Sequence, residues 1–128
     1  MNYYFNKILD VSFDDVIQNV IGALKKEGFG ILTDIDVQQT LKKKLDVNFR
    51  KYRILGACNP PFAYKALQAE DKIGTMLPCN VIVQDIGDGK IEVAAVNPMA
   101  SMQAIENSAL EGIAVQVQVK LEAVIESL

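Results

Sequence analysis

The chain has 128 residues, of which half are hydrophobic and 23% are charged, so it is long enough and apolar enough to bury one core. Its net charge of −3 and pI near 4.9 show no overall basic character, which argues against nucleic acid as a partner. No apolar run approaches the ~18 residues of a transmembrane helix, and the N-terminus lacks a signal-peptide pattern. We therefore expect a single domain over residues 1–128, located in the cytoplasm, with neither a membrane nor nucleic acid as a partner.

The chain contains no histidine and two cysteines, Cys58 and Cys79. The absence of histidine excludes a Ser-His or Cys-His nucleophile within one chain and removes the commonest metal ligand. Without an export signal, the cysteines are expected to be reduced thiols and not a disulfide. The sequence assigns no catalytic residue, and we expect no cofactor and no bound metal.

The N-terminal residues predict a strand followed by an amphipathic helix. Residues 2–9 (NYYFNKIL) are rich in aromatic side chains, as strands are. Ser12 and Asp15 have the spacing of a capping box, which marks the start of the helix, and Gly28 suits the position just after its end. The apolar stripe expected to face the core is Phe13, Ile17, Val20 and Leu24.

Two further strand–helix pairs follow. Residues 29–35 (FGILTDI) predict a second strand, and Asp36 is placed to cap a short second helix. Residues 52–57 (YRILGA) predict a third strand, in which Gly56 permits a close approach of another segment. Pro60 suits the first turn of a third helix with Asn59 as its N-cap. The residues expected to pack this helix on the sheet are Phe62, Ala63, Ala66, Leu67 and Ala69.

The C-terminal half predicts a β-hairpin and a long helix. Residues 79–85 (CNVIVQD) and 91–96 (IEVAAV) are joined by a Gly-Asp-Gly turn and should pair antiparallel. The stretch from Asn107 alternates locally like a strand, but its longer period of three and four favours a helix. Val115 and Val119 lie off the main apolar stripe, and we interpret them as a second face for a partner chain in a homodimer.

The motifs TDIDV, LGACNPP and LPCNV, with the Gly-Asp-Gly hairpin after them, resemble the bacterial and archaeal family called domain of unknown function 302. The resemblance covers nearly the whole chain, although that family often has Thr-Glu-Ile-Asp where this chain has Thr-Asp-Ile-Asp. It implies a small two-layer α/β fold, a homodimer and no established activity. Combined with the elements above, it predicts an α/β (α+β) two-layer sandwich: about five strands in a mixed sheet, with helices on one face and a long C-terminal helix.

The candidate site lies where strands end. If the second and third strands each lead into a helix packed on the same sheet, their C-terminal ends share one edge. That edge would hold a set of polar and thiol side chains: Thr33, Asp34, Asp36, Cys58 and Asn59.

The position of the hairpin relative to this edge has two solutions. If the fourth strand is antiparallel to the third, Cys79 at its start and Asn97 after the fifth strand join the same edge. If the fourth strand is parallel to the third, both residues sit at the far end. We favour the first arrangement, because it brings the sequence motifs together.

Several kinds of chemistry fit such an edge. Helix N-termini bind anions and lower the pKa of nearby thiols, and paired thiolates with carboxylates hold soft or borderline metals such as zinc. The simplest interpretation is that Cys58 and Cys79 are packing residues and that the asparagines only cap helices. The functional hypothesis is a homodimeric binding module for a small anionic or thiol-reactive ligand. The alternative is a thiol-dependent redox protein or enzyme that uses Cys58 or Cys79.

Overall fold

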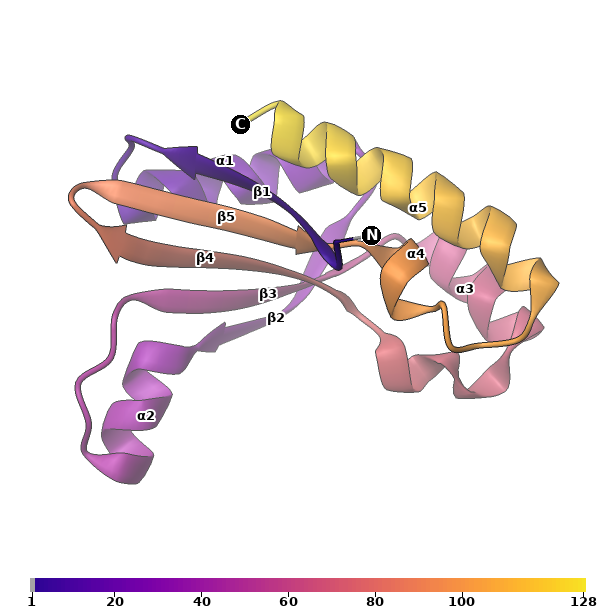
Figure 1. Cartoon of the computed structure of the whole chain (residues 1–128), viewed down its shortest axis with the longest axis horizontal. Helices are drawn as coiled ribbons and strands as arrows, with labels where there is room; N and C mark the ends of the chain where they lie inside the picture. The colour runs from indigo at the N-terminus through magenta and orange to yellow at the C-terminus, as the bar shows by residue number, and fades with distance from the viewer. Residues whose placement is uncertain (1) are drawn as a thin grey trace.

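The computed structural model describes residues 2–128 and forms a sheet with helices packed on one of its faces (Figure 1). In chain order the elements are β1 (Tyr4–Leu9), α1 (Phe13–Lys26), β2 (Gly30–Asp36), α2 (Val37–Leu45), β3 (Tyr52–Cys58), α3 (Pro60–Ala69), the 3₁₀ helix η1 (Asp71–Met76), β4 (Cys79–Gly87), β5 (Lys90–Val96), α4 (Pro98–Ser101) and α5 (Ser108–Glu126). The predicted α+β two-layer fold with a long C-terminal helix is confirmed.

The sheet has the strand order β1-β5-β4-β3-β2, and every neighbouring pair is antiparallel. The predicted mixed sheet is therefore wrong in this detail. A parallel β2–β3 pair needs a helix that crosses back along the sheet. The nine-residue α2 does not do this, because none of its residues is buried and the chain simply returns beside β2.

The core lies between α1, α5 and one face of the sheet. Ser12 accepts a hydrogen bond from the Asp15 N–H and caps α1, as the capping box predicts. The predicted stripe of α1 is buried, and so is the main stripe of α5. The sheet supplies alternate residues to the same core: Leu55, Ala57, Val81, Val83, Ile91, Val93 and Ala95.

The predicted hairpin between β4 and β5 is confirmed. Gly87 pairs with Lys90, so Asp88 and Gly89 form a two-residue turn, and both have positive φ angles, of 55° and 71°. This is the backbone that Asp-Gly favours in a type I′ hairpin turn. The hairpin fixes β5 beside β4, and hence places the residues that follow β5.

The third helix packs against the main core through Phe62, but not along its whole apolar side as predicted. Figure 1 shows α3 beside α5 at the end of the sheet, and a small apolar cluster joins it to η1 and to the start of α5. Ala66 is the buried residue of α3, and Leu67 is exposed. The apolar side of α3 is therefore packed in part, and in part, at Ala63 and Leu67, it lines an open space.

Candidate functional site

The strand register brings both cysteines to the same end of the sheet. Cys58 pairs with Gly30 at the start of β2, and Cys79 pairs with Ala57, the residue before Cys58. Asn97 follows β5, which runs parallel to β3 across the intervening antiparallel β4, so it reaches this end as well. The structure thus has the favoured of the two arrangements, in which Cys58, Cys79 and Asn97 share an edge.

The two aspartates of the candidate set lie away from this edge. Asp34 pairs with Leu55 and Asp36 with Arg53, so they sit toward the opposite end of β3. The prediction that they join Cys58 is wrong because β2 and β3 are antiparallel. Thr33 lies between the two groups, opposite Gly56.

Asp34 and Asp36 have structural partners instead. Arg53 donates two hydrogen bonds to the Asp34 carboxylate, and its Nε lies 2.7 Å from Oδ1. These bonds lower the pKa of Asp34 below its usual value and outweigh the opposite effect of burial. The Asp36 carboxylate accepts from the Gln39 N–H at 3.0 Å and caps α2, as predicted.

The two asparagines are both buried, but only one caps a helix. Asn97 Oδ1 accepts from the Met99 N–H, as a cap should. Asn59 makes no side-chain capping bond to α3, contrary to the prediction. Its amide nitrogen donates to the Glu27 carbonyl at 3.1 Å, which ties the end of α1 to the start of α3.

The two helix starts are poor anion sites. Pro60 and Pro61 have no N–H, and the Ala63 N–H already donates to the Asn59 carbonyl, so only the Phe62 N–H remains in the first turn of α3. The other start, α4, is a single turn of four residues. The double proline could have shown this from the sequence.

An apolar cavity occupies the strand end, with a volume of about 340 Å³. Cys58, Cys79 and Asn59 line it together, and Asn59 carries the only side-chain nitrogen or oxygen in the lining drawn from residues 2–128. No lining residue is charged. The two helical walls consist of Phe62, Ala63, Ala66 and Leu67 from α3 and Ile113, Ala114 and Val117 from α5.

The cavity mouth is also apolar. Leu32, Leu67 and Gly74 are exposed lining residues, and Leu32 is 66% exposed. The β2–β3 register shifts between Ile31 and Thr33, which makes Leu32 the extra residue of a bulge. Bulges redirect a side chain, and here the redirected leucine belongs to the cavity lining. Sequence reasoning missed Leu32, because no pattern in the sequence marks the bulge.

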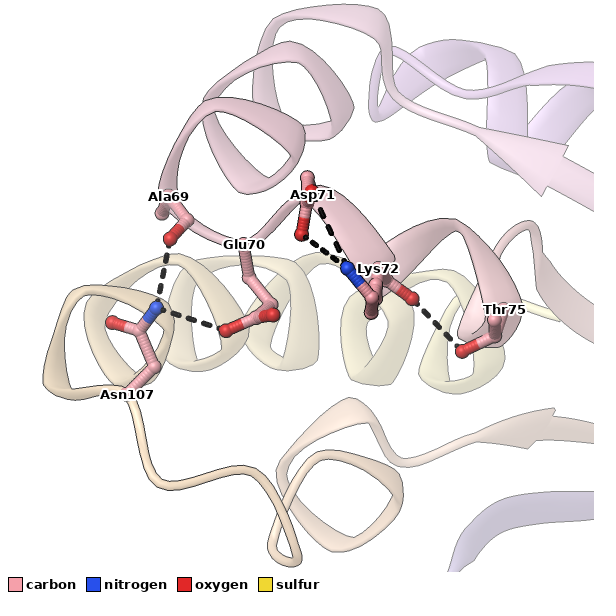
Figure 2. Close-up of polar contacts among 6 residues, drawn as sticks. All are labelled: Ala69, Glu70, Asp71, Lys72, Thr75 and Asn107. Atoms are coloured by element: carbon pink, nitrogen blue, oxygen red, sulfur yellow. Dashed lines mark hydrogen bonds and ion pairs between the residues drawn. The ribbon is translucent and has the colours of Figure 1, made fainter.

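Asn107 joins the two helices, α3 and α5, that form the helical walls of the cavity. Its amide nitrogen donates to the Ala69 carbonyl at 2.8 Å and to the Glu70 carboxylate at 3.4 Å, as Figure 2 shows. The same residue caps α5 through Oδ1 and the Ala109 N–H. One side chain thus holds the end of α3 against the start of α5, and the η1 turn follows directly, closed by the bond from Thr75 Oγ1 to the Lys72 carbonyl.

Burial raises the pKa of the Cys79 thiol to about 11, and the nearby Cys58 adds to this shift. Cys79 is therefore a neutral thiol near pH 7. The residues from 2 to 128 contain no group of three or more Cys, Asp and Glu side chains placed to hold a metal ion. The cavity wall thus offers sulfur atoms, among them the neutral thiol of Cys79, and one amide.

Gly56 holds the edge of the site in place. A Cβ there would lie 2.1 Å from Thr33 Oγ1 and 2.7 Å from Pro78 Cγ, so the close approach predicted for this glycine is confirmed. We expect Gly56→Ala to destabilise the protein by about 1–3 kcal/mol in urea unfolding, because Thr33 and the cavity-lining Pro78 must shift. Gly112→Ala on α5 is the control, since its Cβ meets nothing and alanine favours a helix. Equal effects at the two positions would contradict this explanation.

The fold and the cavity define a class: a small two-layer α+β protein with an antiparallel sheet, a long C-terminal helix and an apolar strand-end cavity. The family model described as Domain of unknown function DUF302 matches residues 5–128. The chain belongs to that family. A solved structure of an uncharacterized conserved protein DUF302 from Bacillus stearothermophilus is 25% identical, covers 98% of each chain and superposes with a TM-score of 0.90. No curated protein matches the chain. No helix within residues 2–128 has the length and apolar character needed to cross a bilayer.

Proposed function

We propose that this protein binds a small, uncharged and largely apolar molecule in the cavity between α3 and α5. The observation that carries the proposal is the lining: a partly open cavity of about 340 Å³ is lined by apolar side chains, two thiols and one amide. This volume is at the lower end of the roughly 300–1,000 Å³ of small-molecule sites. Because the cavity is partly open, an apolar ligand would displace water from its apolar lining, which favours binding.

The lining also indicates whether a charged or an uncharged ligand is favoured. A carboxylate or phosphate inside the cavity would lose its hydration without gaining a cationic partner, which costs several kcal/mol. The proline-rich start of α3 supplies little compensation. The anionic ligand considered from the sequence is therefore the weaker form of the hypothesis, and a neutral ligand is the stronger one.

The two polar groups at the wall suggest how such a ligand is oriented. Asn59 Nδ2 is engaged by the Glu27 carbonyl, which leaves Oδ1 to accept a hydrogen bond from a ligand hydroxyl or amide. Cys79 contributes a neutral thiol. The redox or catalytic alternative is not favoured at Cys79, because a nucleophilic cysteine needs a lowered pKa and this one is raised.

The proposal predicts binding of a neutral apolar probe and its loss when the cavity is filled. N-phenyl-1-naphthylamine should bind with a fluorescence increase, and decan-1-ol should displace it at least tenfold more effectively than decanoate at pH 8. Ala63→Phe places a ring into the cavity from α3 and should weaken probe binding by at least tenfold.

The matched control is Ala109→Phe on α5. Ala109 is exposed and does not line the cavity, so this substitution should leave the probe affinity within twofold of the original chain. Absence of binding by the original chain, or an unchanged affinity in Ala63→Phe, would refute the proposal. Stronger displacement by decanoate would refute the neutral ligand while retaining the cavity as the site.

A further inference from the structure

Residues 42–51 (KKKLDVNFRK) are the most basic ten-residue segment of the chain. They contain five basic residues and one acidic residue, a charge of +4, whereas the rest of the chain carries −7. We call this segment, which comprises the end of α2 and the loop to β3, the basic tip. The sequence-based expectation that no membrane is a partner rests on the overall composition, which conceals this separation of charge.

The basic tip extends from a helix that is attached to the sheet. α2 contacts β3, its residues Val37 and Leu41 are half-buried, and Gln38 Nε2 donates to the Phe49 carbonyl at 3.0 Å. Beyond this attachment, every residue from 42 to 48 is exposed. Figure 1 shows α2 and the loop after it extending beyond the sheet on the side away from α5. The outer end of α2 is therefore accessible to a large partner.

Most of the positive charge in the basic tip has no acidic partner. Lys42 pairs with Asp46 at 2.8 Å, and within residues 2–128 no other residue of the tip forms an ion pair. Arg50 Nε donates to the amide oxygen of Gln84, which does not compensate the guanidinium charge. The cations that remain are Lys43, Lys44, Arg50 and Lys51. Clusters of four or more such cations on a helix are typical of segments that bind anionic lipid headgroups.

Two exposed aliphatic side chains lie among these cations. Leu45 is 66% exposed and Val47 is 43% exposed. They flank Asp46, the C-cap of α2, which has a left-handed φ of 53° and donates its N–H to the Lys42 carbonyl at 3.0 Å. This cap fixes the turn, so the aliphatic side chains and the lysines before them are presented together. Such a combination suits a bilayer surface, where aliphatic groups enter the boundary of the acyl chains and amines meet the phosphates.

The aromatic side chains of this region favour a bilayer over nucleic acid. Proteins that bind single-stranded nucleic acid stack its bases on aromatic rings. Phe49 is half-buried, and the Arg50 guanidinium lies over its ring, 4.3 Å from the ring centre. The same guanidinium lies 5.6 Å from the centre of the Tyr52 ring. Both rings thus have a partner within the chain, whereas the exposed apolar side chains of the basic tip are aliphatic.

We propose that the basic tip docks this protein on bilayers that contain anionic phospholipid, with Leu45 and Val47 inserted at the level of the headgroups. The contact is peripheral, because a nine-residue helix is too short to span the ~30 Å hydrocarbon core of a bilayer. The acidic remainder of the chain is repelled by the same surface, so the protein is oriented with the basic tip toward the bilayer. This docking does not rest on the proposed ligand or on the cavity.

Cosedimentation with large unilamellar vesicles tests the docking. The original chain should bind vesicles of equal parts phosphatidylglycerol and phosphatidylcholine at least tenfold more strongly than vesicles of phosphatidylcholine alone. Lys43→Glu combined with Lys44→Glu should weaken this binding at least tenfold. The matched control is Lys25→Glu combined with Lys26→Glu, because these lysines are also exposed, adjacent and in the last turn of a helix. The control changes the net charge equally and should leave binding within threefold of the original chain.

Insertion of the basic tip is measured separately. The chain has no tryptophan, so the fluorescence of Leu45→Trp reports on the tip alone. It should shift to shorter wavelength on the phosphatidylglycerol vesicles and be quenched by lipids with brominated acyl chains. Val119→Trp on α5 is the control, since Val119 is 61% exposed but lies outside the tip, and it should show neither change.

The salt dependence tests the role of charge without any substitution. About 1 M NaCl shortens the Debye length to roughly 3 Å and should weaken vesicle binding of the original chain at least tenfold. Absence of binding by the original chain, or equal binding to both kinds of vesicle, overturns the proposal. Equal losses in the two double-lysine variants also overturn it, because they remove the specific role of the tip. Vesicle binding without a change in Leu45→Trp fluorescence refutes the insertion, and binding of a single-stranded oligonucleotide in place of the vesicles assigns the tip to nucleic acid.

Discussion

Replacing Leu121 with alanine should lower the free energy of unfolding by about 2–5 kcal/mol, a large part of the roughly 5–15 kcal/mol that stabilises a domain. Leu121 is 0% exposed and lies in the main stripe of α5, where it packs into the core between α1, α5 and the sheet. Its removal loses apolar burial and leaves a void that the surrounding strands cannot fill completely. Urea unfolding monitored by circular dichroism measures the difference.

Val119→Ala provides the matched control on the same helix. Val119 is exposed, so its truncation should change the free energy of unfolding by no more than about 0.5 kcal/mol in the monomer. A loss at Val119 comparable to the loss at Leu121 would contradict the orientation of α5. That outcome would instead require a covering partner on the outer face of the helix.

The thiol of Cys79 should react with iodoacetamide about a hundredfold more slowly at pH 7 than a thiol with the ordinary pKa of 9.0, because its pKa is about 11. The thiolate is the reactive form, so the rate should rise about tenfold per pH unit from pH 7 to 10 without a plateau. In the Cys58→Ser variant Cys79 is the remaining cysteine. Mass spectrometry of samples quenched at successive times then measures the alkylation rate of Cys79 alone.

Two controls test whether the raised pKa of Cys79, and not another cause, makes its alkylation slow. The same variant in urea should react at the rate of a free thiol, because unfolding removes the burial that raises the pKa. The second control is Val119→Cys combined with Cys58→Ser and Cys79→Ser. Its exposed cysteine should react at the rate of a free thiol in the folded protein. Fast alkylation of folded Cys79 with a plateau below pH 9 would show a stabilised thiolate and revive the catalytic alternative.

The parts of the fold that follow from local pattern were predictable. The stripe beginning at Phe13, the Asp88–Gly89 turn and the helical period after Asn107 each depend on neighbours in sequence, and the structure confirms all three. Local chemistry also placed the caps at Ser12 and Asp36 correctly. In each case, the hydrogen bond or apolar contact is made within a few residues.

The direction of β2 relative to β3 was not predictable in this way. It depends on whether the helix between the two strands crosses the sheet. The apolar face of α2 is moderate, and its sequence pattern is the same whether that face is buried or exposed. This single error moved Asp34 and Asp36 to the wrong end of the sheet. Cys58, Cys79 and Asn97 were grouped correctly, because the hairpin constrains β4 and β5 together.

The cavity itself depends on contacts that no short motif encodes. Asn59 holds α1 across 32 residues of chain, and Asn107 holds the end of α3 across 38. Together with the bulge at Leu32, these contacts position elements that line the cavity. Sequence reasoning treated the alanines of α3 as packing residues, and Ala66 and Ala69 do pack with Ile73 and Leu110. It missed that Ala63 and Ala66 also line the cavity.

The central claim is that the space between α3 and α5 binds an uncharged apolar ligand. The most direct test is a crystal structure of the protein equilibrated with 10-bromodecan-1-ol, with the bromine located by anomalous scattering. We predict one strong peak inside the cavity, among Phe62, Val117 and Cys79, with the hydroxyl directed to Asn59. A cavity without density at saturating ligand, or a peak only on the uncovered face of the sheet, would contradict the claim.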